Sequence, residues 1–382
     1  MTAGMNAERL QAIGEHIQTT IDDRLYWGAR ILVARHGETV LDLTLGTADE
    51  ARTKPIQPDS VFSIFSVTKA FINVLVLRSV ELGRIALTTK VVDIIPEFAG
   101  APRDRATIYN LLTHTAGMPG VWEPAPGLYL DILSETLHEV VTRVHGIVEP
   151  GERCDYSPMV NHVLLSVILE RTDPKGRGIV DILREDLWGP LGMDDTAMGI
   201  KAHMRDRHVE PDYRGVVPIK SLSRTHPDEM GLHLAESNEA PWAGGASTAT
   251  DMMKFVEMLR NEGAYEGGRI LSPRMLQIAR QNHTGDLPNE LYKTVALRAG
   301  YPVPPAYIGL GFNVRGPRMV NTQLGTLTNP ETFGNYGAGS TLIWVDPVLD
   351  ISFVGLTAGL LPQAANIERF QRISDMVVAA AE

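Results

Sequence analysis

The chain has 382 residues, of which 44% are hydrophobic and 21% are charged, as in an ordinary globular protein. This length can bury a large core and is compatible with two domains or with one domain that carries a large insertion. The formal net charge of −11 argues against nucleic acid and anionic membranes as partners, because both are negatively charged themselves.

The N-terminal region is expected to begin with an amphipathic helix, since Leu10, Ile13, Ile17 and Ile21 recur at helical spacing. No basic region or apolar core of a signal peptide precedes this helix. No apolar stretch reaches the ~20 residues that span a bilayer. Cys154 is the only cysteine, which rules out an internal disulfide and gives no sign of an oxidising compartment. We therefore expect a cytoplasmic protein.

Both ends of the chain carry predicted strands. Residues 29–35 and 39–45 form two strands joined by a short turn, and residues 341–345 and 351–356 form a second such pair. A last helix is predicted over residues 365–380. Because short turns join antiparallel neighbours, we expect both pairs to contribute to one antiparallel sheet.

The middle of the chain has a helical pattern instead, with helices predicted over residues 66–82, 107–114, 159–171, 179–187 and 250–260. We therefore expect an α/β (α+β) fold. Residues 1–65 and 225–382 would form an antiparallel sheet flanked by helices, and residues 66–224 a mostly helical inserted domain. The segment 281–329, rich in Pro, Gly and Asn, is expected to form loops over a site.

Ser66 and Lys69 open a predicted helix in which nearly every face is apolar, and such a helix is buried. Residues three positions apart share a helix face, so the two side chains should meet near the positive end of this helix. Burial lowers the pKa of a lysine, and a neutral amine can take a proton from serine. Alternatively, Ser66 caps the helix and Lys69 extends outward, because Ser-x-x-Lys alone also occurs by chance.

Six segments in chain order resemble the class C β-lactamase-like serine hydrolases, a family that includes family VIII carboxylesterases and D,D-peptidases. The segments are residues 61–70 (VFSIFSVTKA), 107–118 (TIYNLLTHTAGM), 149–157 (EPGERCDYS), 189–193 (GPLGM), 243–251 (AGGASTATD) and 333–347 (FGNYGAGSTLIWVDP). The resemblance covers nearly the whole chain and implies a β-lactamase/transpeptidase-like fold with Ser66 as nucleophile and Lys69 as base.

The resemblance also implies the remaining site residues. Tyr156 would lie beside Ser66 and Lys69 as a proton shuttle, provided that the nearby cation favours its phenolate. The backbone N–H groups of Ser66 and Ala338 would form the oxyanion hole, with Gly337 and Gly339 leaving room for a substrate carbonyl. The substrate-binding candidates are Asn335, Tyr336, Gly337, Trp122 and Trp242.

Two positions depart from the family pattern. The second motif of the lactamases is Tyr-x-Asn, but Pro158 stands two residues after Tyr156, where the motif has Asn. Asn161 would need a different backbone path to replace the missing amide. The third motif usually begins with Lys or His, whereas Asn335 supplies no charge for a substrate carboxylate. Both departures favour a neutral ester or amide over a β-lactam or a peptidoglycan peptide.

We therefore expect a serine hydrolase of the carboxylesterase type that acts on a small ester or amide through an acyl-enzyme. The alternatives are acyl transfer from the same intermediate, β-lactamase or D,D-peptidase activity, and an inactive binding protein. Neither a His-Glu-x-x-His motif nor a Gly-x-Gly-x-x-Gly loop is present, and we expect no metal or cofactor. His226, Asp228 and His233 are expected to be solvated, His114 to hydrogen-bond the backbone, and Cys154 to be a buried, inert thiol.

Overall fold

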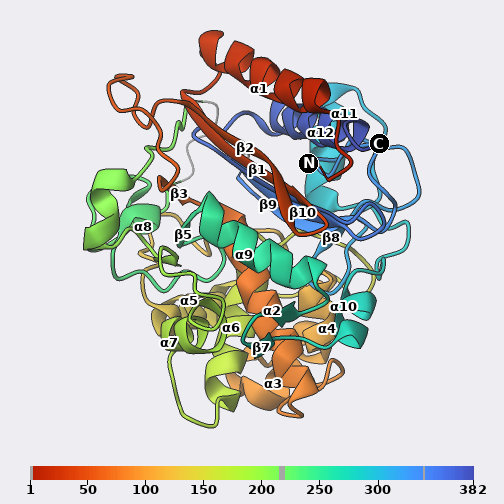
Figure 1. Cartoon of the computed structure of the whole chain (residues 1–382). Helices are drawn as coiled ribbons and strands as arrows, with labels where there is room; N and C mark the ends of the chain where they lie inside the picture. The colour runs from red at the N-terminus through yellow and green to blue at the C-terminus, as the bar shows by residue number, and fades with distance from the viewer. Residues whose placement is uncertain (1–2, 215–219, 339) are drawn as a thin grey trace.

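In the computed structural model, which describes residues 3–214, 220–338 and 340–382, the two chain ends meet in one sheet (Figure 1). Within the described residues this sheet has six antiparallel strands in the order β2-β1-β11-β10-β9-β8. The strands are β1 (Gly28–Arg35), β2 (Glu38–Gly46), β8 (Asn313–Val314), β9 (Phe333–Gly337), β10 (Thr341–Asp346) and β11 (Ile351–Thr357). The predicted joining of the N-terminal and C-terminal hairpins is thus confirmed.

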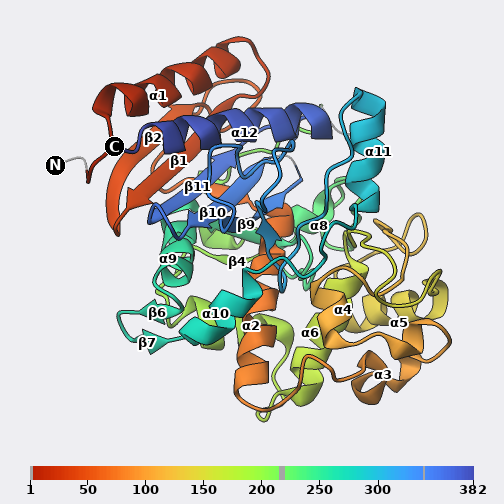
Figure 2. The ribbon, with the colours of Figure 1, turned by 90° about the vertical axis from the view of Figure 1, so that its right-hand side faces the viewer.

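Helices cover both faces of this sheet. The first helix, α1 (Ala7–Asp22), and the last, α12 (Gln363–Ala379), lie side by side on one face, and α9 (Ala249–Arg260) packs against β10 and β11 on the other (Figures 1 and 2). Alternation along the strands explains both layers. In β1, for example, Ile31 and Val33 join the core under α1 and α12, whereas Leu32 joins the core on the α9 side.

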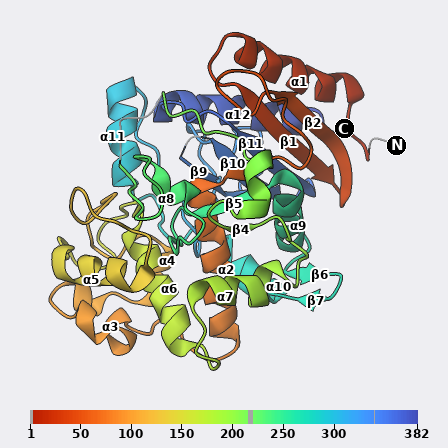
Figure 3. The same cartoon turned by 90° about the vertical axis from the view of Figure 1, so that its left-hand side faces the viewer.

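Most of the remaining helices gather below the sheet, whereas α11 (Glu290–Ala299) lies beside α12 (Figure 3). The others are α2 (Thr68–Glu81), α3 (Val91–Ile94), α4 (Ile108–Leu112), α5 (Leu133–Arg143), α6 (Val160–Thr172), α7 (Ile179–Leu183), α8 (Gly231–Leu234) and α10 (Pro273–Ala279). Two small sheets, β3-β5-β4 and β6-β7, contain β3 (Val61–Ser63), β4 (Ala197–Met198), β5 (Gly245–Thr248), β6 (Ala264–Tyr265) and β7 (Gly268–Arg269). Helix α2 is buried along almost its whole length, as its sequence predicts.

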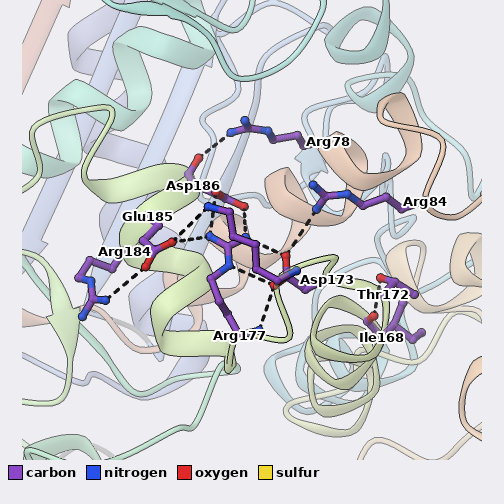
Figure 4. Close-up of polar contacts among 10 residues, drawn as sticks. Arg78, Arg84, Ile168, Thr172, Asp173, Arg177, Arg184, Glu185 and Asp186 are labelled. Carbon is purple, nitrogen blue, oxygen red and sulfur yellow. Dashed lines mark hydrogen bonds and ion pairs between the residues drawn. The ribbon is translucent and has the colours of Figure 1, made fainter.

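An ion-pair network fastens the end of α6 to the turn that follows α7 (Figure 4). The Arg177 guanidinium lies 2.8 Å from a carboxylate oxygen of Asp173 and 2.8 Å from one of Asp186. It also donates to Glu185, and Arg78 of α2 donates to the Asp186 carbonyl oxygen. Hydrogen bonds from Arg177 hold the pKa of Asp173 at about 2. A charge buried this deeply is stable only with such partners.

Most predicted elements are present, with bounds that differ by at most three residues. The helix predicted over residues 179–187 is an exception, because α7 ends at Leu183 and a π-helix follows over Arg184–Trp188. The α-helix predicted to begin at Ser66 begins instead at Thr68, because Phe65–Val67 form a 3-10 turn. Within the segment 281–329, sequence reasoning missed α11 and β8. The proposed domain boundaries at residues 65/66 and 224/225 stay a prediction. Among the described residues, no helix is both long and apolar enough to cross a membrane.

Candidate active site

Ser66 lies in a tight turn between β3 and α2. The preceding residue, Phe65, has a φ of +47°, a conformation that a bulky side chain rarely adopts. Two contacts hold it there: its buried ring packs 4.8 Å from the His233 ring, and its carbonyl oxygen accepts a 2.6 Å hydrogen bond from the Thr68 hydroxyl. A strained backbone conformation of this kind persists only where surrounding contacts hold it in place, and it is common at active sites.

Lys69 meets Ser66 one turn further along, as the sequence predicts. Its Nζ lies 2.9 Å from Ser66 Oγ and donates a 2.7 Å hydrogen bond to the Trp242 carbonyl oxygen. The side chain is buried, and desolvation holds the pKa of Lys69 well below its usual value. The lowered pKa makes the amine easier to deprotonate beside the serine hydroxyl.

Tyr156 completes the group. Its hydroxyl shares a hydrogen bond with Ser66, and Lys69 Nζ lies 5.3 Å from the centre of its ring. Burial raises the pKa of Tyr156 to about 12, and the bond to Ser66 offsets only part of this increase. The phenol is thus neutral at neutral pH. Burial and the Ser66 hydrogen bond account for this shift, and the expected role of Lys69 in favouring a phenolate stays a prediction.

Two histidines and an asparagine lie behind these residues. His114 Nδ1 accepts a 3.0 Å hydrogen bond from the Ser157 N–H, which confirms its predicted bond to the backbone. Burial lowers the pKa of His114 to about 3 and that of His162 well below its usual value, so both rings are neutral. His162 Nε2 lies 3.0 Å from Asn73 Oδ1. Sequence reasoning missed both His162 and Asn73. Asn73 could have been found, because it is a polar residue four positions after Lys69 in an otherwise apolar helix.

Strand β9 passes beside the nucleophile. A Cβ on Gly337 would lie only 3.0 Å from the Ser66 nitrogen and 2.3 Å from the Ile64 carbonyl oxygen, so this close approach needs glycine. Ala338 follows with a φ of +37°, and Gly339 lies outside the described residues. The Asn335 side chain donates a 3.0 Å hydrogen bond to the Gly311 carbonyl oxygen instead of facing solvent.

A cavity of about 330 Å³ joins these groups, and we call it the Ser66 cavity. Its lining is mostly polar and comes from the turn that carries Ser66, from α2, α6 and β9, from the segment 308–313 and from the loops that carry His114 and Tyr156. The lining residues are Ser66, Lys69, Asn73, His114, Tyr156, His162, Ile308, Gly311, Asn313, Asn335 and Tyr336. The expectation that part of the segment 281–329 covers a site is confirmed by Ile308, Gly311 and Asn313.

Several residues that the sequence suggested for the site do not line the Ser66 cavity. The Trp122 side chain is 44% exposed and Trp242 reaches the site through its carbonyl oxygen, so neither side chain belongs to the lining. The Asn161 amide donates to the Leu111 carbonyl oxygen. The expectation for His233 was wrong: its ring is buried, and its Nδ1 lies 3.2 Å from the Ala243 carbonyl oxygen.

Comparison with known proteins shows the family of the chain. The model of the β-lactamase family matches residues 14–376. The chain belongs to the β-lactamase family. It is similar to Protein Rv1367c of Mycobacterium tuberculosis, with 28% identity over 89% of this chain and 84% of that protein. Esterase EstB of Burkholderia gladioli is 32% identical over 51% of this chain and 52% of EstB.

Solved structures show the same fold. A penicillin-binding protein homologue from Caulobacter crescentus superposes with a TM-score of 0.75 at 25% identity, covering 99% of each chain. The β-lactamase/transpeptidase-like fold expected from the sequence is therefore confirmed. The β-lactamase-fold serine hydrolases related to this chain include esterases, penicillin-binding proteins and carboxypeptidases, so membership alone leaves the substrate open.

Proposed function

We propose that this member of the β-lactamase family is a carboxylesterase that cleaves a small, uncharged ester through an acyl-enzyme on Ser66. The observation that carries the proposal is the contact between Ser66 Oγ and the buried Lys69 amine, 2.9 Å apart. An amine whose pKa is held well below its usual value by burial can accept the serine proton as Oγ attacks.

The reaction then proceeds in two halves. Ser66 Oγ forms a bond to the ester carbonyl carbon, its proton passes to Lys69, and the N–H groups of Ser66 and Ala338 donate to the oxyanion. Collapse of this intermediate breaks the bond to the alcohol oxygen, which leaves with a proton relayed through Tyr156. In the second half, water loses a proton to the same pair and attacks the acyl carbon. The bond between the acyl carbon and Ser66 Oγ then breaks, Oγ takes up that proton, and the acid leaves.

The choice of an ester rests on what the site lacks. Pro158 stands where lactamases carry an amide, and the Asn161 amide is committed to Leu111. Asn335 stands where a lysine would hold a substrate carboxylate, and its amide group is committed to Gly311. Without these groups the site offers few partners to a β-lactam or to the carboxylate of a peptide. An uncharged ester needs only the oxyanion N–H groups for its carbonyl oxygen.

The test compares turnover of p-nitrophenyl acetate with that of nitrocefin, and follows Ser66 by the intact mass of the protein. We expect the ester to be the better substrate and the acetyl adduct to disappear in S66A. S79A is the matched control, because Ser79 is a buried serine in the same helix and has no part in the Ser66 cavity. Nitrocefin as the better substrate would contradict the ester assignment.

A further inference from the structure

A second, larger cavity adjoins the Ser66 cavity. It has a volume of about 800 Å³ and shares Asn313 and Tyr336 with the Ser66 cavity. Its walls come from α11, the segment 301–307, the segment 320–323 and the start of α12. Figure 2 shows α11 standing against the start of α12, at the end of the sheet where β8 and β9 lie.

The walls of the second cavity are mostly apolar. Three prolines and four tyrosines line it, together with the aliphatic side chains of Val295, Val320 and Ile367. Aromatic and aliphatic walls with few polar groups are typical of sites for apolar ligands. Proline and tyrosine side chains also lose little conformational freedom when a ligand binds, so such walls are preformed.

The charged side chain that lines the second cavity is held by backbone carbonyl oxygens. Among its described lining residues there is no carboxylate, and the one cation is Arg315. The Arg315 guanidinium donates a 2.8 Å hydrogen bond to the Gly316 carbonyl oxygen and another to that of Thr326. Arg315 therefore holds the backbone of its own loop, and an uncharged ligand fits these walls better than a carboxylate.

Tyr336 stands at the junction of the two cavities. It belongs to β9, the strand that passes beside Ser66, and its hydroxyl shares a hydrogen bond with Tyr292 of α11. The two rings meet edge to face, with their centres 5.9 Å apart. Because Tyr336 lines both cavities, a substrate that reaches from Ser66 into the second cavity would contact this ring.

We propose that the second cavity binds an apolar, uncharged chain or ring of the substrate while Ser66 attacks its ester carbonyl. This inference rests on the proposed function, since it names the class of ester that the site accepts. It predicts that a substrate extended by methylene groups gains affinity, by up to about fourfold for each group that becomes buried.

Two ester series test the inference. One lengthens the acyl chain of p-nitrophenyl esters from acetate to octanoate, and the other lengthens the alcohol of acetate esters. In at least one series, kcat/KM should rise with length. A364F narrows the second cavity from α12 and should lower kcat/KM for the longest ester at least tenfold, with acetate unchanged. A365F is the matched control, because Ala365 is the exposed next residue of the same helix.

A second filling variant, V295W on α11, guards against an A364F protein that does not fold, and melting temperatures report on folding. Equal effects of A364F and A365F across both series would overturn the inference, as would a preference for an ω-carboxylate ester over the alkyl ester of the same length. No turnover of any ester and no adduct on Ser66 would instead overturn the proposed function.

Discussion

Replacing Lys69 by methionine separates a catalytic lysine from a structural one. Methionine has a similar length and is apolar, so K69M removes the desolvation cost of a buried amine. It also leaves the Trp242 carbonyl oxygen without its donor, which costs about 1–3 kcal/mol. The two effects oppose each other, and we expect the free energy of unfolding to stay within about 2 kcal/mol of the wild type.

The activity should respond very differently from the stability. A general base contributes a factor of about 10² to 10⁴, and K69M should lower kcat/KM for p-nitrophenyl acetate by that amount. The assay is the release of p-nitrophenol, measured beside a thermal melt. K201M is the matched control, because Lys201 also donates to a backbone carbonyl oxygen, that of Glu236, and has no part in the Ser66 cavity.

K69R tests whether the lysine acts as a base or only as a positive charge, since arginine stays protonated in proteins. We expect K69R to be as inactive as K69M. Retention of more than a tenth of the wild-type kcat/KM in K69M, or an equal loss in K201M, would refute the assignment of Lys69 as the base.

Three further predictions concern pH, stability and packing. Since burial lowers the pKa of Lys69 and raises that of Tyr156 to about 12, kcat/KM should rise through the lysine pKa and not decline between pH 7 and 9; a decline there would contradict these assignments. Asp173 has a pKa of about 2 in the folded state against an ordinary 3.8, so its stabilisation is present above pH 4 and is lost as the pH falls through 2. D173N should therefore cost about 2 kcal/mol in a denaturant titration at pH 7 and roughly half of that at pH 3, and an equal cost at both would exclude this origin. G337A places a Cβ 3.0 Å from the nucleophile's amide nitrogen and should lower both kcat/KM and the melting temperature. G14A in α1 meets no atom closer than 3.5 Å and should leave kcat/KM unchanged and the melting temperature equal or higher, because alanine favours a helix over glycine; equal losses in the two variants would contradict this account.

The sequence predicted the sheet well because its pattern depends on local chemistry. The alternation of Ile31, Leu32 and Val33 follows the two faces of β1, and short turns bring neighbouring strands together. The pairing of β1 with β11 joins residues more than 300 positions apart, and it could be expected only because each end of the chain carried one hairpin.

The site was predicted in part. Ser66 and Lys69 lie one helical turn apart, so their contact follows from local geometry. The neutral state of Tyr156 could not be read from the sequence, because its pKa depends on burial by residues distant in the chain. The buried position of His233 was missed for the same reason: the residues before it suggest an exposed loop, and only the tertiary fold brings its ring against Phe65.

The second cavity lay beyond sequence reasoning altogether. The proline-rich segment 301–307 has no periodicity, and its role depends on the position of α11 and α12. Arg315 illustrates the difficulty, since a lone arginine near a site suggests an anion, yet its partners here are two carbonyl oxygens of its own loop.

The central claim is that Ser66 becomes acylated, and intact-protein mass spectrometry after rapid quenching with a p-nitrophenyl ester tests it most directly. We expect one acyl group per chain, located on the Ser66 peptide, in the wild type and in S79A, and none in S66A. An adduct on another residue, or ester turnover that persists in S66A, would contradict the account.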